Sequence, residues 1–213
     1  MANHVVARSM GVAAVILTGF AIVSTGLVAF TFTGTREIIA ANERAALLSN
    51  LNALVSPERY DNRLDEDTLP IIDPEYMGTD EPVTVYRAYQ HGEPVAVLAA
   101  PVAPDGYSGP IRLLIGVYAD GTLAGVRVLS HKETPGLGDP IELGRSDWVL
   151  SFTGKSLNNP DSKGWAVKKD GGVFDQFTGA TITPRAVVKA VRRFLEYFQQ
   201  HREQLFAKRE NAA

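Results

Sequence analysis

The chain has 213 residues, 45% of them hydrophobic, which is enough for one domain with its own core and an additional segment. It contains no cysteine, which excludes disulfides, a thiolate nucleophile, an iron–sulfur cluster and a zinc site with cysteine ligands. The net charge of -3, from 21 Lys and Arg against 24 Asp and Glu, argues against a general nucleic-acid-binding protein.

The charges are distributed unevenly, because Arg8 is the one Asp, Glu, Lys or Arg among the first 35 residues. Residues 10–32 form an uncharged run of 23 residues, 16 of them apolar. A membrane-spanning helix needs about 20 such residues, so this run predicts a retained transmembrane helix at about 10–32. The alternatives are a cleaved signal peptide, whose apolar region is shorter and ends at a small-x-small site, and a buried core helix.

The flanks of this run give little information on its orientation, since Arg8 precedes it and Arg36 and Arg44 follow it. The short N-terminal flank and the large polar C-terminal portion favour a C-terminal domain outside the cytoplasm, which in a bacterium is the periplasmic side of the inner membrane.

Residues 36–55 predict a helical stalk, with leucines and isoleucines at mixed helical spacing and Pro57 soon after its end. Residues 58–82 are acidic and contain Pro70, Pro74 and Pro82, which indicates an irregular linking segment.

Strand patterns follow. Residues 83–89 and 94–100 flank Gly92 and predict an antiparallel pair, and residues 111–118 and 122–130 flank Asp120-Gly121, which suits a tight hairpin turn. A third hairpin is expected around residues 169–171, although each glycine could also belong to an ordinary turn.

The last element is an amphipathic helix, with Thr183 as the expected N-cap and Pro184 in the first turn. Its apolar face follows helical spacing and consists of Val187, Val188, Val191, Phe194, Leu195 and Phe198. The order of helix, strands and helix predicts an α+β domain with an antiparallel sheet.

Two loops could carry chemistry, whereas the four scattered histidines lack metal-ligand spacing and no nucleotide-binding or nucleophile motif is present. Residues 131–139 contain glycines that permit close approach of the backbone to a ligand, or that simply serve a rigid connection. Residues 175–185 place small residues and hydroxyls before a helix N-terminus, which attracts anions such as phosphate; a cap and turn without a ligand is the alternative.

Residues 178–181, Thr-Gly-Ala-Thr, resemble the Ser/Thr-Gly-Ala-Thr motif of covalent FMN-binding domains. The wider sequence is similar to the G subunit of the Rnf (Rsx) ion-translocating electron-transport complex. The similarity includes the membrane helix, the Gly-Tyr-Ser-Gly segment at 106–109, the His-x-Glu-Thr-Pro-Gly-Leu-Gly loop at 131–138, and the residues around 168–172 and 175–177.

The resemblance implies one FMN per chain, joined by its phosphate to the hydroxyl of Thr181 and installed by a flavin transferase that uses FAD. It also implies a set of residues around the flavin, namely Thr178, Gly179, Ala180, Thr183, Glu133, Thr134, Leu137 and Gly138. The absence of cysteine and the scattered histidines predict no metal site. Lys168 is expected to hold the phosphate or the ring edge. The implied division is a membrane segment at 1–35, a stalk and linker at 36–82, an FMN-binding domain at 83–206 and a tail at 207–213.

The function implied is electron relay within a membrane complex that couples electron transfer between ferredoxin and NAD to ion movement. The partners are then the other subunits of that complex, the membrane and the flavin transferase, with no nucleic acid. Alone the protein is an electron carrier without catalytic residues of its own. Alternatives are the equivalent C subunit of the Na⁺-translocating NADH:quinone reductase, a membrane-anchored FMN-domain sensor and a structural anchor without flavin.

Overall fold

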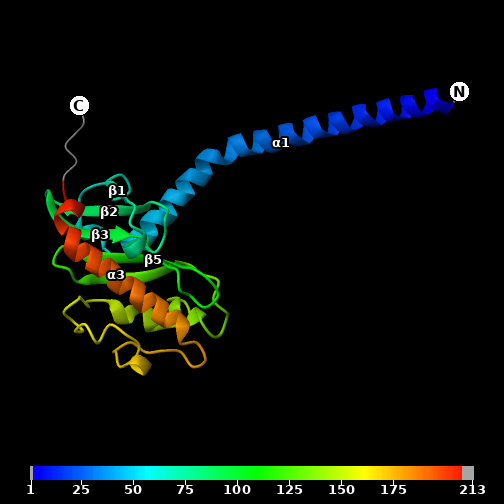
Figure 1. The fold of residues 1–213 in the computed structure, drawn as a ribbon. Coiled ribbons are helices and arrows are strands. Elements are labelled where there is room, and N and C mark those ends of the chain that lie inside the picture. The colour runs from blue at the N-terminus through cyan, green and yellow to red at the C-terminus, as the bar shows by residue number, and fades with distance from the viewer. Residues whose placement is uncertain (1, 208–213) are drawn as a thin grey trace. The chain divides into compact units, whose positions relative to one another are not determined.

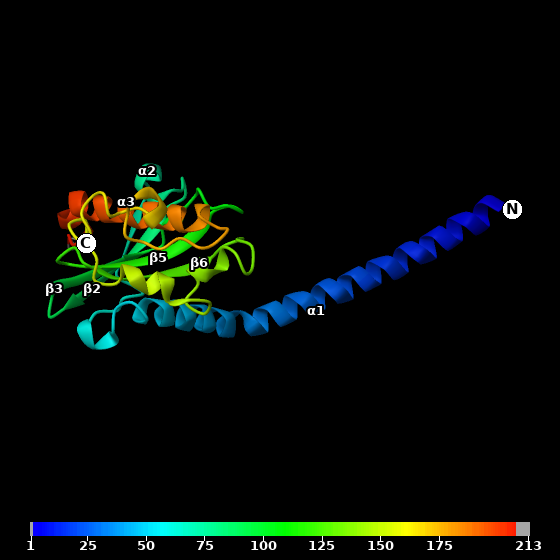
Figure 2. The same ribbon diagram turned by 90° about the horizontal axis from the view of Figure 1, so that it is seen from below.

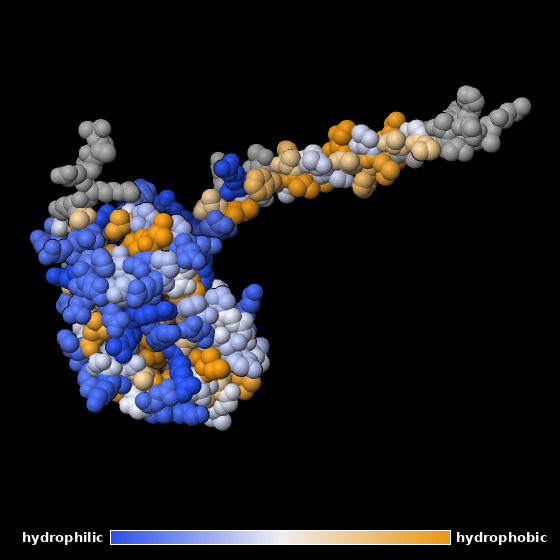
Figure 3. Space-filling view, in the orientation of Figure 1, coloured by the Kyte–Doolittle hydropathy of each residue, from blue (hydrophilic) through white to orange (hydrophobic). Residues whose placement is uncertain are grey.

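The computed structural model describes residues 2–207, and these form two compact units divided between Ala46 and Leu47. Helix α1 runs over Ala2–Asn52. Its residues up to Ala46 make up the first unit, and its last residues belong to the second. Within it the window Ala14–Arg36 is long and apolar enough to cross a membrane, and none of the window is buried in the protein. Figure 3 shows the apolar side chains exposed along this helix, so it is not the core helix of a soluble domain. The predicted apolar helix is confirmed.

The second unit is built on a six-stranded antiparallel sheet (Figure 1). Its strands are β1 (Thr68–Ile71), β2 (Val83–Gln90), β3 (Glu93–Ala99), β4 (Val102–Ala103), β5 (Ile111–Tyr118) and β6 (Leu123–Ser130). Strands β1, β2, β3 and β5 are successive neighbours; β4 pairs with the start of β5, and β6 also pairs with β5. The α+β class and the antiparallel sheet predicted from the sequence are confirmed.

Two of the predicted hairpins are present and one is not. His91 and Gly92 both have positive φ in the β2–β3 turn, and Gly121 has a φ of 88° in the β5–β6 turn, as tight hairpin turns require. The hairpin expected around residues 169–171 was wrong: Lys168–Asp170 forms a 3₁₀ turn, and Val167 and Phe174 form an isolated parallel bridge. Gly171, with a φ of 86°, ends that turn.

Part of the segment predicted to be irregular is ordered secondary structure. It contains β1, the edge strand that pairs with β2, and the short helix α2 (Pro74–Met77). Asp73 caps α2 through a bond from the Tyr76 N–H, and Pro74 occupies a first-turn position, where proline is tolerated. Of the three prolines that suggested a linker, Pro70 therefore lies in an edge strand and Pro74 at a helix start, two positions that suit proline, and Pro82 directly precedes β2. The domain boundaries stated above stay a prediction.

Helix α3 (Ile182–Leu205) covers one face of the sheet, and the chain around Leu51, Leu54 and Val55 covers the other (Figure 2). The apolar face predicted for α3 is confirmed, because all six of its residues are buried in the larger core. The smaller core joins the end of α1 to the opposite sheet face, on which Ala88, Leu98 and Leu114 lie.

The start of α3 differs from the prediction. The helix begins at Ile182 with Thr181 as N-cap, so Thr183 was wrong as the cap. The hydroxyl of Thr183 points inward and bonds a carboxylate instead. Pro184 still lies among the first four residues, whose N–H groups have no partner within the helix, so its missing N–H costs no helical bond.

The other end of α3 is held by a buried arginine from β2. Arg87 is 4% exposed; its Nε donates to Asp67 Oδ1 at 2.7 Å and its Nη1 donates to the carbonyl of Ala207 at 2.6 Å. Tyr89 adds a bond from its hydroxyl to the carbonyl of Phe206 at 3.0 Å. A cation beside the last carbonyls of a helix is favourable, so this contact fixes α3 against the sheet.

Replacing Arg87 with methionine removes the cation, so Asp67 and the carbonyl of Ala207 lose the hydrogen bonds that Arg87 donates to them. We expect the free energy of unfolding to fall by roughly 2–4 kcal/mol, as for the loss of one partner of a buried ion pair. Urea unfolding of the full chain in detergent, followed by tryptophan fluorescence, measures the change. R63M, which breaks the exposed Arg63–Glu66 pair, is the control and should change stability by less than about 0.5 kcal/mol.

Candidate functional site

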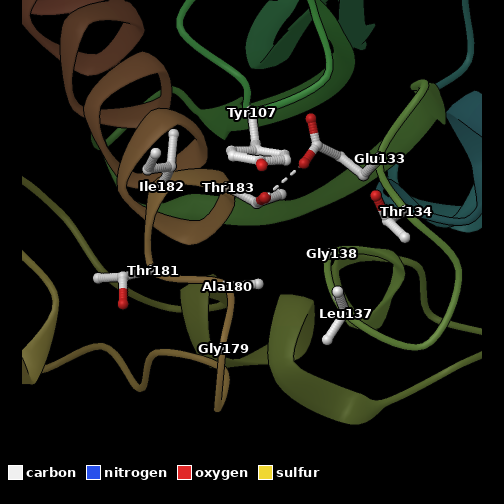
Figure 4. A pocket seen from close by; sticks show the side chains of 10 residues that line it. All are labelled: Tyr107, Glu133, Thr134, Leu137, Gly138, Gly179, Ala180, Thr181, Ile182 and Thr183. Atoms are coloured by element: carbon white, nitrogen blue, oxygen red, sulfur yellow. Dashed lines mark hydrogen bonds between the residues drawn. The ribbon is translucent and has the colours of Figure 1, made fainter.

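The two loops singled out in the sequence meet at one pocket, between the end of β6 and the start of α3 (Figure 4). The cavity has a volume of about 280 Å³. It is lined by Tyr107, Glu133, Thr134, Leu137, Gly138, Gly179, Ala180, Thr181, Ile182 and Thr183. Eight of the ten residues predicted for the flavin site therefore lie around a single cavity.

The glycine-containing loop forms one wall. The N–H groups of Leu137 and Gly138 both donate to the carbonyl of Thr134, and the N–H of Gly136 donates to the buried carboxylate of Asp139 at 2.7 Å. Gly136 has a φ of 78°, which a side chain disfavours. This tight turn positions Leu137 at the rim of the pocket, where it is about half exposed.

The opposite wall is the loop before α3. The N–H of Ala180 donates to the carbonyl of Phe177 at 3.2 Å, and Gly179 between them has a φ of 82°, so these residues form a tight turn. The Phe177 ring packs edge-on against Trp148, whose indole N–H donates to the carbonyl of Asp175 at 2.8 Å. The loop is therefore fixed to the rest of the domain by Trp148.

Three threonines in this region offer hydroxyl groups, and the structure distinguishes them. Thr178 is exposed and does not line the pocket, and Thr183 is fully buried with its hydroxyl bonded to Glu133. Thr181 lines the pocket, is half-buried, and makes no hydrogen bond through its side chain in the described part of the chain, although it is the N-cap. Its hydroxyl is thus available for chemistry beside the free N–H groups and positive dipole end of α3.

Glu133 lies at the inner end of the pocket and is 5% exposed. One carboxylate oxygen accepts the Thr183 hydroxyl at 2.5 Å, and the other accepts the N–H of Ser108 at 3.0 Å. Among residues 2–207 it has no basic side chain as partner. Because an unpaired buried carboxylate needs its hydrogen-bond donors, Glu133 links three segments of the pocket wall: its own loop, the 106–109 segment and the start of α3.

His131 supports this arrangement from behind. Its Nδ1 accepts the N–H of Glu133 at 2.9 Å, and its Nε2 lies 2.6 Å from the Glu142 carboxylate. Since Nδ1 is an acceptor, the ring proton lies on Nε2 and is donated to Glu142.

The structure positions Lys168 and Thr178 outside the pocket. Lys168 Nζ pairs with Asp175 Oδ1 at 2.5 Å, on the loop that leads to Thr178. Tyr107 and Ile182 line the pocket but were not among the predicted residues. The Gly-Tyr-Ser-Gly resemblance is a signal that could have indicated Tyr107. For Ile182, the signal is its position between Thr181 and Thr183, which were both predicted.

Replacing Thr183 with valine keeps the shape of the side chain but leaves one oxygen of a buried carboxylate without its donor. We expect the free energy of unfolding to fall by about 1–3 kcal/mol. T178V, at an exposed position, should leave it within about 0.5 kcal/mol of the wild-type value. Equal unfolding curves for T183V and the wild type would contradict the role assigned to this bond.

The residues around the pocket fit a group with a phosphate at one end. A side chain on Gly138 would bring a Cβ within 2.9 Å of Glu133 Oε2, and Gly179 and Ala180 also contribute almost no bulk to the wall. An available hydroxyl, a helix N-terminus and a wall of small residues together suit a phosphate that is bonded to the chain.

Comparison with known proteins agrees with this geometry. Residues 106–196 match the family model of the FMN-binding domain, and residues 1–54 match that of the RnfG N-terminal region. The fold and the pocket thus define a protein with an FMN-binding domain, preceded in sequence by an apolar helix.

Relatives similar along nearly the whole chain share one name, the G subunit of an ion-translocating oxidoreductase complex. The protein of Pseudomonas aeruginosa (strain UCBPP-PA14) is 52% identical over 205 residues, 96% of each chain. That of Pseudoalteromonas atlantica is 50% identical over 192 residues, 90% of this chain and 89% of the relative, and one from Vibrio cholerae serotype O1 (strain ATCC 39541) is 48% identical over 190 residues, 89% and 90%. The chain belongs to this family, the G subunits of ion-translocating oxidoreductase complexes.

Proposed function

We propose that this protein is the membrane-anchored flavoprotein of an Rnf-type ion-translocating oxidoreductase complex, in which it relays electrons through one FMN bonded to Thr181. The observation that carries the attachment site is the state of the Thr181 side chain: it lines the pocket at a helix start and makes no capping bond. The proposal is supported by the family match and by the names of the relatives.

The chain's own groups have separate tasks in this proposal. Thr181 supplies the bonding oxygen, and the first N–H groups of α3 stabilise the phosphate charge. Leu137 and Tyr107 provide apolar surface at the rim, while Glu133 keeps the walls of the pocket together. When bound, FMN supplies an isoalloxazine ring that accepts and releases electrons.

The attachment needs a separate flavin transferase, because none of the pocket residues is arranged to activate the Thr181 hydroxyl. Within the part of the chain that the structure describes, no carboxylate or histidine bonds to that hydroxyl. The transferase and the other subunits of the complex are the partners that we propose. The apolar helix would anchor the protein in the bacterial inner membrane, with the flavin domain on the periplasmic side.

The direct test is co-expression of the full chain with a flavin transferase, followed by a denaturing gel. A flavin that is bonded to the chain stays with the band and fluoresces after unfolding, whereas a flavin that is only bound is lost. We expect a fluorescent band at the size of the full chain, and a folded but non-fluorescent protein would contradict covalent attachment.

The orientation requires a second experiment. A reporter enzyme that is active outside the cytoplasm, fused to the C-terminus, should be active in cells. Activity of a reporter that works only in the cytoplasm would reverse the proposed topology.

A further inference from the structure

Arg185 lies one helical turn after Thr181, and its backbone N–H donates to the backbone carbonyl of Thr181 at 3.3 Å. Thr181 is the N-cap, yet its φ of -81° and ψ of -28° are helical. The rule for helical neighbours four residues apart therefore applies, and their Cβ atoms lie on one face about 5–6 Å apart. The guanidinium of Arg185 is the nearest cation along the helix to the available hydroxyl.

Asp170 holds this guanidinium in a fixed position. Arg185 Nε and Nη2 each donate to one oxygen of the Asp170 carboxylate, both at 2.5 Å, while both side chains stay about 40% exposed. The hydrogen bonds from Arg185 hold the pKa of Asp170 below its usual range, so the pair is ionised at neutral pH. A two-pronged pair of this kind orients the planar guanidinium.

The turn that carries Asp170 also contacts the other end of the loop before α3. Lys168 pairs with Asp175, and the N–H of Lys169 donates to the Gln176 side chain at 3.2 Å. The turn over Lys168–Asp170 therefore bonds to the chain both before and after residues 177–181. The bonds between Arg185 and Asp170 join this turn to the first turn of α3, which follows Thr181.

We propose that Arg185 is the positioning residue for the phosphoryl group on Thr181, and that Asp170 is a competing anion, which binds the guanidinium until that group displaces it. This inference rests on the proposed function. In the transfer, the Thr181 Oγ1–P bond forms, the phosphoanhydride bond of FAD breaks, AMP leaves and the hydroxyl proton is released to solvent. The transferred phosphoryl group is anionic before and after the transfer, so it attracts a guanidinium that shares its helix face.

The pair Arg185 and Asp170 offers a matched test, because removing either residue breaks the same ion pair. The full-length wild type, R185Q, R185K and D170N are incubated in detergent with FAD and a flavin transferase, and the fraction of labelled chain is followed by intact mass against time. K189Q is the control, because Lys189 pairs with Asp105 in a similarly exposed ion pair one turn further along the same helix. Thermal unfolding of each variant is measured alongside.

R185Q should be labelled at least about fivefold more slowly than the wild type, since it loses a charge-assisted bond to the phosphoryl group. R185K should fall between them, because lysine keeps the charge but not the planar fork. D170N should be labelled about two- to fivefold faster, since it frees the guanidinium from an exposed ion pair. R185Q and D170N should unfold at similar temperatures.

Equal slowing of R185Q and D170N would show that only the ion pair matters and would overturn the assignment of Arg185. Slowing of K189Q to the same extent as R185Q would also overturn it, because any cation on the helix would then suffice. An unlabelled wild type would overturn the proposed function itself, and a labelled wild type with an unaffected R185Q would overturn this inference alone.

Discussion

Replacement of Thr181 by alanine is expected to abolish the covalent flavin completely. The other two threonines of the segment cannot substitute for it, because Thr178 is outside the pocket and the Thr183 hydroxyl is buried and bonded to Glu133. Since the Thr181 side chain makes no capping bond, its removal should leave the fold intact. In-gel flavin fluorescence and thermal unfolding of the same sample measure the two effects.

T181S is the matched control for this variant, since it keeps a hydroxyl at the same place. It should retain most of the fluorescence, and T178A should retain it as well. A fluorescent band from T181A would mean that another residue is the acceptor, and loss of the fold in T181A would mean that Thr181 has a structural role.

Replacement of Gly138 by alanine is expected to destabilise the domain by about 1–3 kcal/mol, as overpacking of a tight site does. Its φ of -98° is ordinary, so the effect is steric. The added Cβ would lie 2.8 Å from Glu133 Cβ and 3.1 Å from Thr183 Oγ1, both of them buried. Because the same crowding shifts the start of α3, attachment of flavin should also slow. Urea unfolding followed by the fluorescence of Trp148 and Trp165 gives the free energy.

G144A tests whether the effect comes from the pocket. A Cβ on Gly144 would meet no atom within 4 Å, and this glycine lies in the same part of the chain. Its free energy of unfolding should stay within about 0.5 kcal/mol of the wild-type value. Equal effects of G138A and G144A would contradict the packing of Gly138 against Glu133.

The strands β2, β3, β5 and β6 could be predicted because runs of strand-forming residues flank turn signals at Gly92 and Asp120-Gly121. The helix α3 could be predicted because its apolar residues repeat with helical spacing. The edge strand β1 could not, because its four residues include Pro70 and lie among acidic residues, and it is defined by its pairing with β2. Short elements that depend on a distant partner leave little local pattern.

The site, like the fold, has parts that could be predicted from the sequence and parts that could not. The loops at 131–138 and 178–181 could be found because they resemble a known motif, and the structure brings them to one pocket. The bond between Glu133 and Thr183 joins residues 50 positions apart, so no local spacing indicates it, and Thr183 was expected to cap the helix instead. Lys168 was expected to hold the flavin phosphate or the ring edge. In the structure it pairs with Asp175, a partner that was not predicted from the sequence.

A peptide mass spectrum tests most directly whether Thr181 carries the FMN. Trypsin cuts after Lys169 and Arg185, so residues 170–185 are released as one peptide that contains Thr178, Thr181 and Thr183. From the full chain co-expressed with a flavin transferase, we predict this peptide with the added mass of FMN less one water, and fragment ions that locate the addition at Thr181. An unmodified peptide, or an addition located at Thr178 or Thr183, would contradict attachment of FMN at Thr181.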